Sequence, residues 1–207
     1  MSKLVAIGGA TQEESYEVQA KVPLKDLTHV LEELNQPDIE ILRQRHYRQY
    51  DTYFVFEDPQ QGRLRYREDD FIDESGLVSN VRSRLTLVGQ VSEYNFPQKV
   101  LLSRSRFIAP ATQNLRFYRE YFKPSRELEI EKDRLRYLIR FKGIEFYINI
   151  DTISKPDLGF FLEVKSRTWS RKDAELKSSL AIDLINHLKA SPEDNISEEY
   201  VDIVETM

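Results

Sequence analysis

The stretch that decides the fold is KDRLRYLIRFKGIEFYINID, residues 132–151. In its first half Lys132, Arg134 and Arg136 recur at every second residue, and after Lys142-Gly143 polar and apolar residues alternate again. A period of two is the repeat of a β-strand, and a two-residue turn of this kind joins antiparallel strands. The stretch therefore predicts a β-hairpin with basic or polar side chains on one face and mostly apolar side chains on the other.

The same spacing of basic residues recurs along the chain, at Arg63/Arg65/Arg67, Arg82/Arg84, Arg104/Arg106, Arg140/Lys142 and Lys165/Arg167. Strands are expected at residues 15–22, 39–56, 63–68, 81–88, 99–108, 115–122 and 127–141, in the hairpin arm that ends at 150, and at 160–167. Helices are expected at 24–34 and 171–189, the second one capped by Ser170. Many short strands with one polar face favour an antiparallel barrel or sandwich.

The composition excludes several classes of site. The 207 residues contain no cysteine, so disulfides and zinc–thiolate sites are absent, and the three histidines are too scattered to indicate a metal site. No run approaches the ~20 apolar residues of a membrane span, and we expect a cytoplasmic protein without membrane contact. We expect one domain over 1–207, with a core at about 15–190 and an acidic C-terminal tail at 191–207.

The net charge of −5 conceals a segregation of charge along the chain. Residues 43–172 hold all eighteen arginines and contain 25 basic residues (Lys and Arg) and 18 acidic residues (Asp and Glu). The two ends of the chain together contain 5 basic and 17 acidic residues. A nucleic-acid surface usually makes a whole domain basic, so nucleic acid is not the expected partner. Basic groups in the middle of an acidic chain favour a small, highly charged anion such as a polyphosphate, because Arg and Lys suit phosphate oxygens.

A series of short motifs follows in order along the chain. They are Glu17-Val18-Gln19-Ala20-Lys21, Gln49–Phe54, Leu64-Arg65-Tyr66-Arg67, Leu85-Thr86, Lys132-Asp133-Arg134, Asn149-Ile150-Asp151 with Gly159–Glu163, and Glu199-Tyr200-Val201. The series resembles the signature of the CYTH superfamily, the triphosphate tunnel metalloenzymes, which include class IV adenylate cyclases and thiamine, inorganic and RNA triphosphatases. The resemblance covers roughly residues 15–204.

The resemblance implies a mainly β (α+β) fold, a closed eight-stranded antiparallel β-barrel (tunnel) with flanking helices. It implies that phosphate is bound by Lys21, Arg65, Arg67, Lys132 and Arg134, and that Mg²⁺ or Mn²⁺ is held by Glu17 and Glu163, with Asp151 as a third ligand. The spacing of basic residues adds five further candidates for phosphate binding, Arg82, Arg84, Arg104, Arg106 and Lys165. No catalytic residue is assigned.

The sequence departs from the family pattern at Gln19, Val88 and Lys165, where the family has an acid, a lysine and an acid. The leading hypothesis is a divalent-metal-dependent hydrolase of an inorganic or organic triphosphate. The alternatives are a class IV-type adenylate cyclase, a non-catalytic domain that binds polyphosphate or nucleotide, and a structural β-domain whose charged face is solvated. The expected partner is a small molecule with a triphosphate, and homodimerisation is left open.

Overall fold

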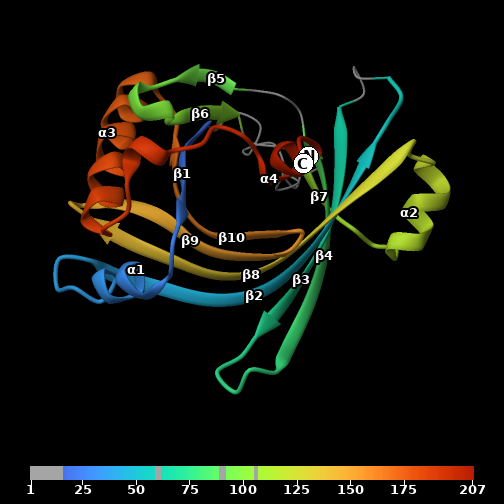
Figure 1. Ribbon diagram of the computed structural model, residues 1–207, viewed down its shortest axis with the longest axis horizontal. Helices are drawn as coiled ribbons and strands as arrows, with labels where there is room; N and C mark the ends of the chain where they lie inside the picture. The colour runs from blue at the N-terminus through green and yellow to red at the C-terminus, as the bar shows by residue number, and fades with distance from the viewer. Residues whose placement is uncertain (1–15, 59–61, 89–91, 105–106) are drawn as a thin grey trace, which may run out of the picture.

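A computed structural model describes residues 16–58, 62–88, 92–104 and 107–207 of the chain. The described strands form a ten-stranded antiparallel sheet in the order β5-β6-β1-β10-β9-β8-β2-β3-β4-β7 (Figure 1). The strands are β1 (Tyr16–Leu24), β2 (Glu40–Val55), β3 (Arg63–Ile72), β4 (Val78–Val88), β5 (Ser92–Asn95), β6 (Leu101–Arg104), β7 (Phe107–Pro110), β8 (Arg126–Phe141), β9 (Ile144–Lys155) and β10 (Asp157–Thr168). The helices are α1 (Thr28–Glu33), α2 (Leu115–Phe122), α3 (Arg171–His187) and α4 (Tyr200–Glu205).

The sheet is strongly curled, but hydrogen bonds between the described strands do not close it into a barrel (Figure 1). The predicted closed eight-stranded barrel is therefore corrected to a curled ten-stranded sheet. The described residues of 99–108, expected as one strand, contribute β6 and β7 to different parts of the sheet, and no pairing between described strands joins those two parts. β6 pairs with β1, whereas β7 pairs with β4 near the other end of the sheet. β6 ends at Arg104 and β7 begins at Phe107, three residues later, so chain connectivity keeps the end of β6 within about 11 Å of the start of β7.

The main hydrophobic core lies on the convex side of the sheet, under α3. On β9, Phe146, Ile148 and Ile150 point into this core and are almost completely buried. The same core takes apolar residues of β1, β8 and β10 and the buried face of α3, including Leu184. Because side chains alternate across a strand, the intervening residues of these strands point to the concave side. The sheet thus has its main apolar face outside, covered by helices, and most of its charged side chains inside.

The predicted hairpin and the α3 cap are both confirmed. Lys142 and Gly143 have φ of 49° and 80°, which suits a two-residue turn between strands with a right-handed twist, and Phe141 pairs with Ile144 across it. The Ser170 side chain accepts a hydrogen bond from the Asp173 backbone N–H at 3.2 Å and caps α3. No helix in the described ranges has the length and apolar character needed to cross a membrane.

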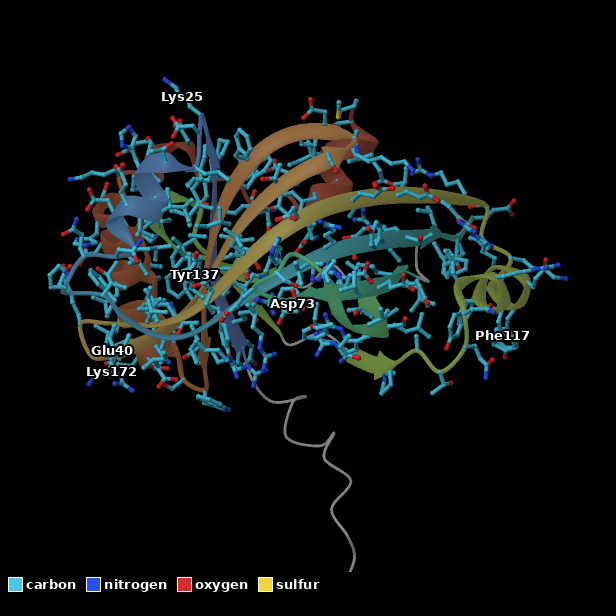
Figure 2. All side chains as sticks on the ribbon, turned by 90° about the horizontal axis from the view of Figure 1, so that it is seen from below. Lys25, Glu40, Asp73, Phe117, Tyr137 and Lys172 are labelled. Atoms are coloured by element: carbon cyan, nitrogen blue, oxygen red, sulfur yellow. The ribbon has the colours of Figure 1, made fainter. Side chains whose placement is uncertain are left out.

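The strand expected at residues 115–122 is wrong, because these residues form helix α2. Its aromatic residues suit a strand, but Asn114 accepts a hydrogen bond from the Phe117 backbone N–H at 3.0 Å and starts a helix. Tyr118 then packs with Phe54 and Tyr66 of the sheet. Figure 2 shows Phe117 on α2 at one end of the molecule, with Glu40 and Lys172 at the opposite end.

The acidic C-terminal tail returns to the concave side of the sheet. Tyr200 and Val201 of α4 are buried against Tyr53, Ile130 and Phe161 of the strands. The backbone N–H of Ile196 donates to the carbonyl of Lys21 on β1 at 2.8 Å. The end of the chain therefore forms a wall inside the curled sheet (Figure 1).

Truncation of a leucine in the convex core tests this placement of α3. Leu184→Ala is expected to lower the free energy of unfolding by about 2–5 kcal/mol, because Leu184 is fully buried against the sheet. Leu176→Ala on the same helix is the control, since Leu176 is 51% exposed, and should change it by about 0.5 kcal/mol or less. Urea unfolding measures both, and equal effects would contradict the packing described.

Candidate functional site

The concave face encloses one cavity of about 300 Å³, lined by residues from β1, β2, β3, β4, β7, β8, β9 and β10 and from the start of α4. Its lining is dominated by cations. They are Arg43, Arg45, Arg65, Arg67, Arg84, Lys132, Arg134, Arg136, Lys165 and Arg167. The carboxylates in the lining are Glu17, Glu163 and Glu199. Basic groups that lie far apart in the sequence therefore converge on one cavity.

Asp51 of β2 compensates three of these cations from behind the cavity surface. Its carboxylate accepts from Arg67 Nε and Nη2 at 2.5 and 2.6 Å and from Lys132 Nζ at 2.9 Å, and Arg65 Nε lies 4.0 Å away. Burial opposes ionisation of Asp51, but the attraction of Arg67, Lys132 and Arg65 outweighs it and holds the pKa well below its usual value. Asp51 is therefore a permanent anion that fixes Arg67 in place.

Asp151 of β9 plays the same part for Arg134. Its two oxygens accept from Arg134 Nε and Nη2 at 2.6 and 2.5 Å, and the Tyr200 hydroxyl donates to Oδ2 at 2.8 Å. Arg134 also lies 3.4 Å from Glu163, which accepts from the Asn149 amide at 2.7 Å. Although burial opposes ionisation of Glu163, Lys165 and Arg134 keep its pKa well below its usual value.

Asp69 is a further buried carboxylate, and it pairs with arginines on the β3–β4 side of the sheet. It accepts from Arg82 Nη2 at 2.9 Å, from Arg84 Nη2 at 2.7 Å and from the Gln49 amide at 2.5 Å. Burial is the main cause that lowers the pKa of Arg84 to about 10, in spite of this carboxylate. Arg84 reaches the cavity, whereas Arg82 does not line it.

Arg65 differs from its neighbour Arg67 because it lacks a close carboxylate partner. Its Nη2 donates to the Thr86 hydroxyl over a long 3.4 Å, and its buried Nε has no hydrogen-bond partner among the described residues. The buried Nε of Arg84 also has no hydrogen-bond partner among the described residues. Buried donors are almost always satisfied in proteins, so the two unpaired Nε atoms are unusual.

Lys132 lies among the cations that line the cavity, and their charges shift its pKa. Desolvation, with the repulsion of Arg67 and Arg134, lowers the pKa of Lys132 to about 7, although Asp51 and Asp151 oppose the shift. Its ammonium also lies 5.3 Å from the centre of the Tyr200 ring. An anion near Lys132 would favour the charged form of this side chain.

The structure brings together eight of the thirteen residues predicted from the sequence. Lining the cavity are Arg65, Arg67, Arg84, Lys132, Arg134, Lys165, Glu17 and Glu163. Lys21 lies outside the lining, since its Nζ donates to the Glu198 carbonyl and lies 4.3 Å from the Tyr200 ring centre. Asp151 lies behind Arg134, and Arg82 pairs with Asp69. Arg104 lies on β6 in register with Tyr16, and Arg106 falls outside the described residues.

The predicted metal ligands do not fit a divalent cation. Lys165 Nζ lies 3.1 Å from Glu17 and 3.2 Å from Glu163, so an ammonium group stands beside both carboxylates. Asp151 has both oxygens engaged by Arg134. Mg²⁺ and Mn²⁺ prefer several oxygen ligands, and the described part of the chain holds no cluster of three or more carboxylate or histidine side chains suited to one.

Sequence reasoning missed several residues that line the cavity or support it. Arg136, Arg167 and the pair Arg43 and Arg45 continue the two-residue spacing of basic residues, so this signal could have identified them. Asp51 lies in a motif that was recognised, but its role depends on the β2–β3 and β2–β8 registers, which place it opposite Arg67 and Ile130.

No protein-family model and no curated protein matches this chain. Among solved structures, it is similar to the PH1819 protein from Pyrococcus horikoshii OT3, with a TM-score of 0.70 and 17% identity over 92% of this chain and 98% of that one. It is also similar to a provisionally assigned adenylate cyclase from Vibrio parahaemolyticus, with a TM-score of 0.63 and 16% identity over the same shares of the two chains. For HpAC1 from Hippeastrum the TM-score is 0.55 and the identity is 10%, over 93% of this chain and 95% of that one.

These similarities show the fold. The chain shares it, over almost its whole length, with two proteins that were provisionally assigned as adenylate cyclases. The resemblance found in the sequence is thus confirmed at the level of the fold. The roles predicted for the individual residues remain predictions.

Removing the charge of Asp51 tests the ionic network. Asp51→Asn is expected to lower the free energy of unfolding by about 3–5 kcal/mol, because Arg67 and Lys132 would lose their buried counter-ion. Glu129→Gln is the control, since Glu129 pairs with Lys155 on the exposed surface, and should cost about 1 kcal/mol or less. Thermal unfolding compares the two variants. A stable Asp51→Asn protein would refute the compensating role.

Proposed function

We propose that this protein binds the triphosphate group of a small molecule in the cationic cavity. The observation that carries the proposal is the convergence of ten basic side chains from the strands on one concave cavity. Arg65 supports it, because this side chain lines the cavity and has no carboxylate within hydrogen-bond distance among the described residues. Arg and Lys are the side chains that suit phosphate oxygens best.

The charges of the site favour a polyanion over a single phosphate. The ten lining cations are opposed by the lining carboxylates Glu17, Glu163 and Glu199 and by the buried Asp51, Asp69 and Asp151. Among the described residues the ten cations thus exceed these six carboxylates by four, and three of the ten, Arg43, Arg45 and Arg167, are exposed to solvent. A triphosphate carries about four negative charges near neutral pH, because its terminal group titrates at ~6. One such ligand would balance the surplus.

The size of the cavity favours a small molecule. A volume of about 300 Å³ is at the lower end of ordinary ligand pockets. The wall formed by Glu199 and Tyr200 further limits the space inside the curled sheet. A nucleic-acid duplex would not enter it. Polyphosphates and triphosphate-bearing metabolites would.

Hydrolysis of the bound triphosphate is a second candidate function. HpAC1, which has this fold, is described as having a dominant triphosphatase activity, and the cavity of the present protein holds Glu17, Glu163 and Glu199 beside the cations. Phosphoryl transfer depends mainly on positioning and electrostatic stabilisation, which the cations Arg65, Lys132 and Arg134 would provide. Because the carboxylates do not fit the predicted metal, no step through a metal is proposed.

Titration calorimetry with inorganic triphosphate tests binding. Arg65→Gln is expected to weaken binding about 10–100-fold, because it removes charge-assisted hydrogen bonds to the ligand. Arg140→Gln is the matched control, since Arg140 pairs with Glu40 and Glu145 away from the cavity and should leave affinity unchanged. Undetectable binding to the unmodified protein, or equal binding by both variants, would refute the proposal.

The pH dependence of binding tests the position of Lys132. With a pKa of about 7, Lys132 is mostly charged below neutral pH and mostly neutral above it, whereas a bound anion would keep it charged. Affinity should therefore fall as pH rises through 7, by up to about tenfold per pH unit. The ligand titrates too, so Lys132→Gln is compared over the same range and should show a smaller fall. Identical pH profiles would place the ligand away from Lys132.

Release of inorganic phosphate tests hydrolysis separately from binding. Inorganic triphosphate, ATP and thiamine triphosphate are incubated with the protein, with and without Mg²⁺ or Mn²⁺, and cyclic nucleotide formation from ATP is measured in parallel. If the cavity catalyses the reaction, Arg65→Gln should slow it at least about tenfold and Arg140→Gln should not. Binding without turnover would identify a non-catalytic triphosphate-binding protein, and cyclic product would identify a cyclase.

A further inference from the structure

Lys165 occupies the acidic part of the cavity that had been expected to hold a metal. It lies on β10 two residues after Glu163, on the same face, and in register with Gln19 of β1. Its Nζ lies 3.2 Å from Glu163 Oε1 and 3.1 Å from Glu17 Oε1. One ammonium group thus links carboxylates from two adjacent strands at the surface of the cavity.

A divalent cation at the same place would meet unfavourable surroundings. It would lie next to the Lys165 ammonium and close to Arg134, which is 3.4 Å from Glu163. Gln19, the neighbour of Glu17 on the same face of β1, adds no charge to the site. Hard divalent cations require a high density of anionic or carbonyl oxygen, and here much of that density is already neutralised by the protein's own cations.

We propose that Lys165 replaces the divalent cation, so that the protein binds the free triphosphate anion and not its metal complex. This inference rests on the proposed binding function. The ammonium compensates Glu17 and Glu163, which would otherwise repel a phosphate. Mg²⁺ in solution then competes with the protein, because it binds the same phosphate oxygens that Lys165 and the arginines require.

Titration calorimetry with sodium triphosphate, in EDTA and then in excess Mg²⁺, tests the inference on the intact protein. Tight binding in EDTA that weakens in Mg²⁺ is the expected result. Binding that requires Mg²⁺ or Mn²⁺ would overturn the inference and leave the proposed function standing. Absence of binding under both conditions would overturn both, so the two failures are distinguishable.

Variants at position 165 give the test a matched control. Lys165→Gln should weaken binding in EDTA about tenfold or more, and Lys165→Arg should retain most of the affinity because it keeps the charge. Lys155→Gln should have no effect, although Lys155 bridges Glu129 and Glu131 in a similar way, because it lies on the exposed surface away from the cavity. Equal binding by the Lys165→Gln and unmodified proteins would overturn the inference.

Lys165→Glu supplies a gain-of-function arm. It would place a third carboxylate beside Glu17 and Glu163, and so create the oxygen cluster that the described residues lack. The variant should bind triphosphate poorly in EDTA and regain affinity when Mn²⁺ is added. Its thermal unfolding with Mn²⁺ alone provides a readout that does not depend on the triphosphate. A variant that binds as the unmodified protein does, with or without Mn²⁺, would contradict the role of Lys165.

Discussion

The structure depends on compensation of the positive charges that the curled sheet gathers on its concave face. Burying an unpaired ion costs several kcal/mol, so such a face is stable only with anions close by. Asp51 and Asp151, both fully buried, provide this for Lys132, Arg67 and Arg134. The hydrophobic core is meanwhile displaced to the convex side, where α3 covers it. The concave side therefore holds the charged network and one apolar cluster around Tyr200, whereas most of the hydrophobic core lies on the convex side.

Compensation is incomplete among the described residues, and the proposal that the interior binds a ligand rests on this. Arg67 and Arg134 are each held by two hydrogen bonds to a carboxylate, and so form a fixed frame. Arg65 and Arg84 stand beside them with unpaired donors. Lys165 neutralises the carboxylates that would repel an anion. The C-terminal segment adds Tyr200 as a wall, and it withdraws Lys21 from the lining by bonding its ammonium to the Glu198 carbonyl.

Much of this could be predicted from residues at every second position. The spacing predicted the hairpin around Lys142-Gly143 and two residues that line the cavity, Arg84 and Lys165, and the family resemblance predicted six more. It failed at residues 115–122, where an aromatic segment is helical because Asn114 caps it. It also could not show how Lys165 meets Glu17, since that contact depends on the register between β1 and β10. Contacts of this kind depend on which distant strands pair and in which register, and local sequence preference does not determine them.

The central claim, that an anion binds among the cations of the concave face, is tested most directly by a crystal structure with inorganic triphosphate. The account predicts electron density for the ligand in the cavity, with its oxygens within hydrogen-bond distance of Arg65 and Lys132 and close to the Lys165 ammonium. Density for the ligand only on the outer surface, or an empty cavity at saturating triphosphate, would contradict it.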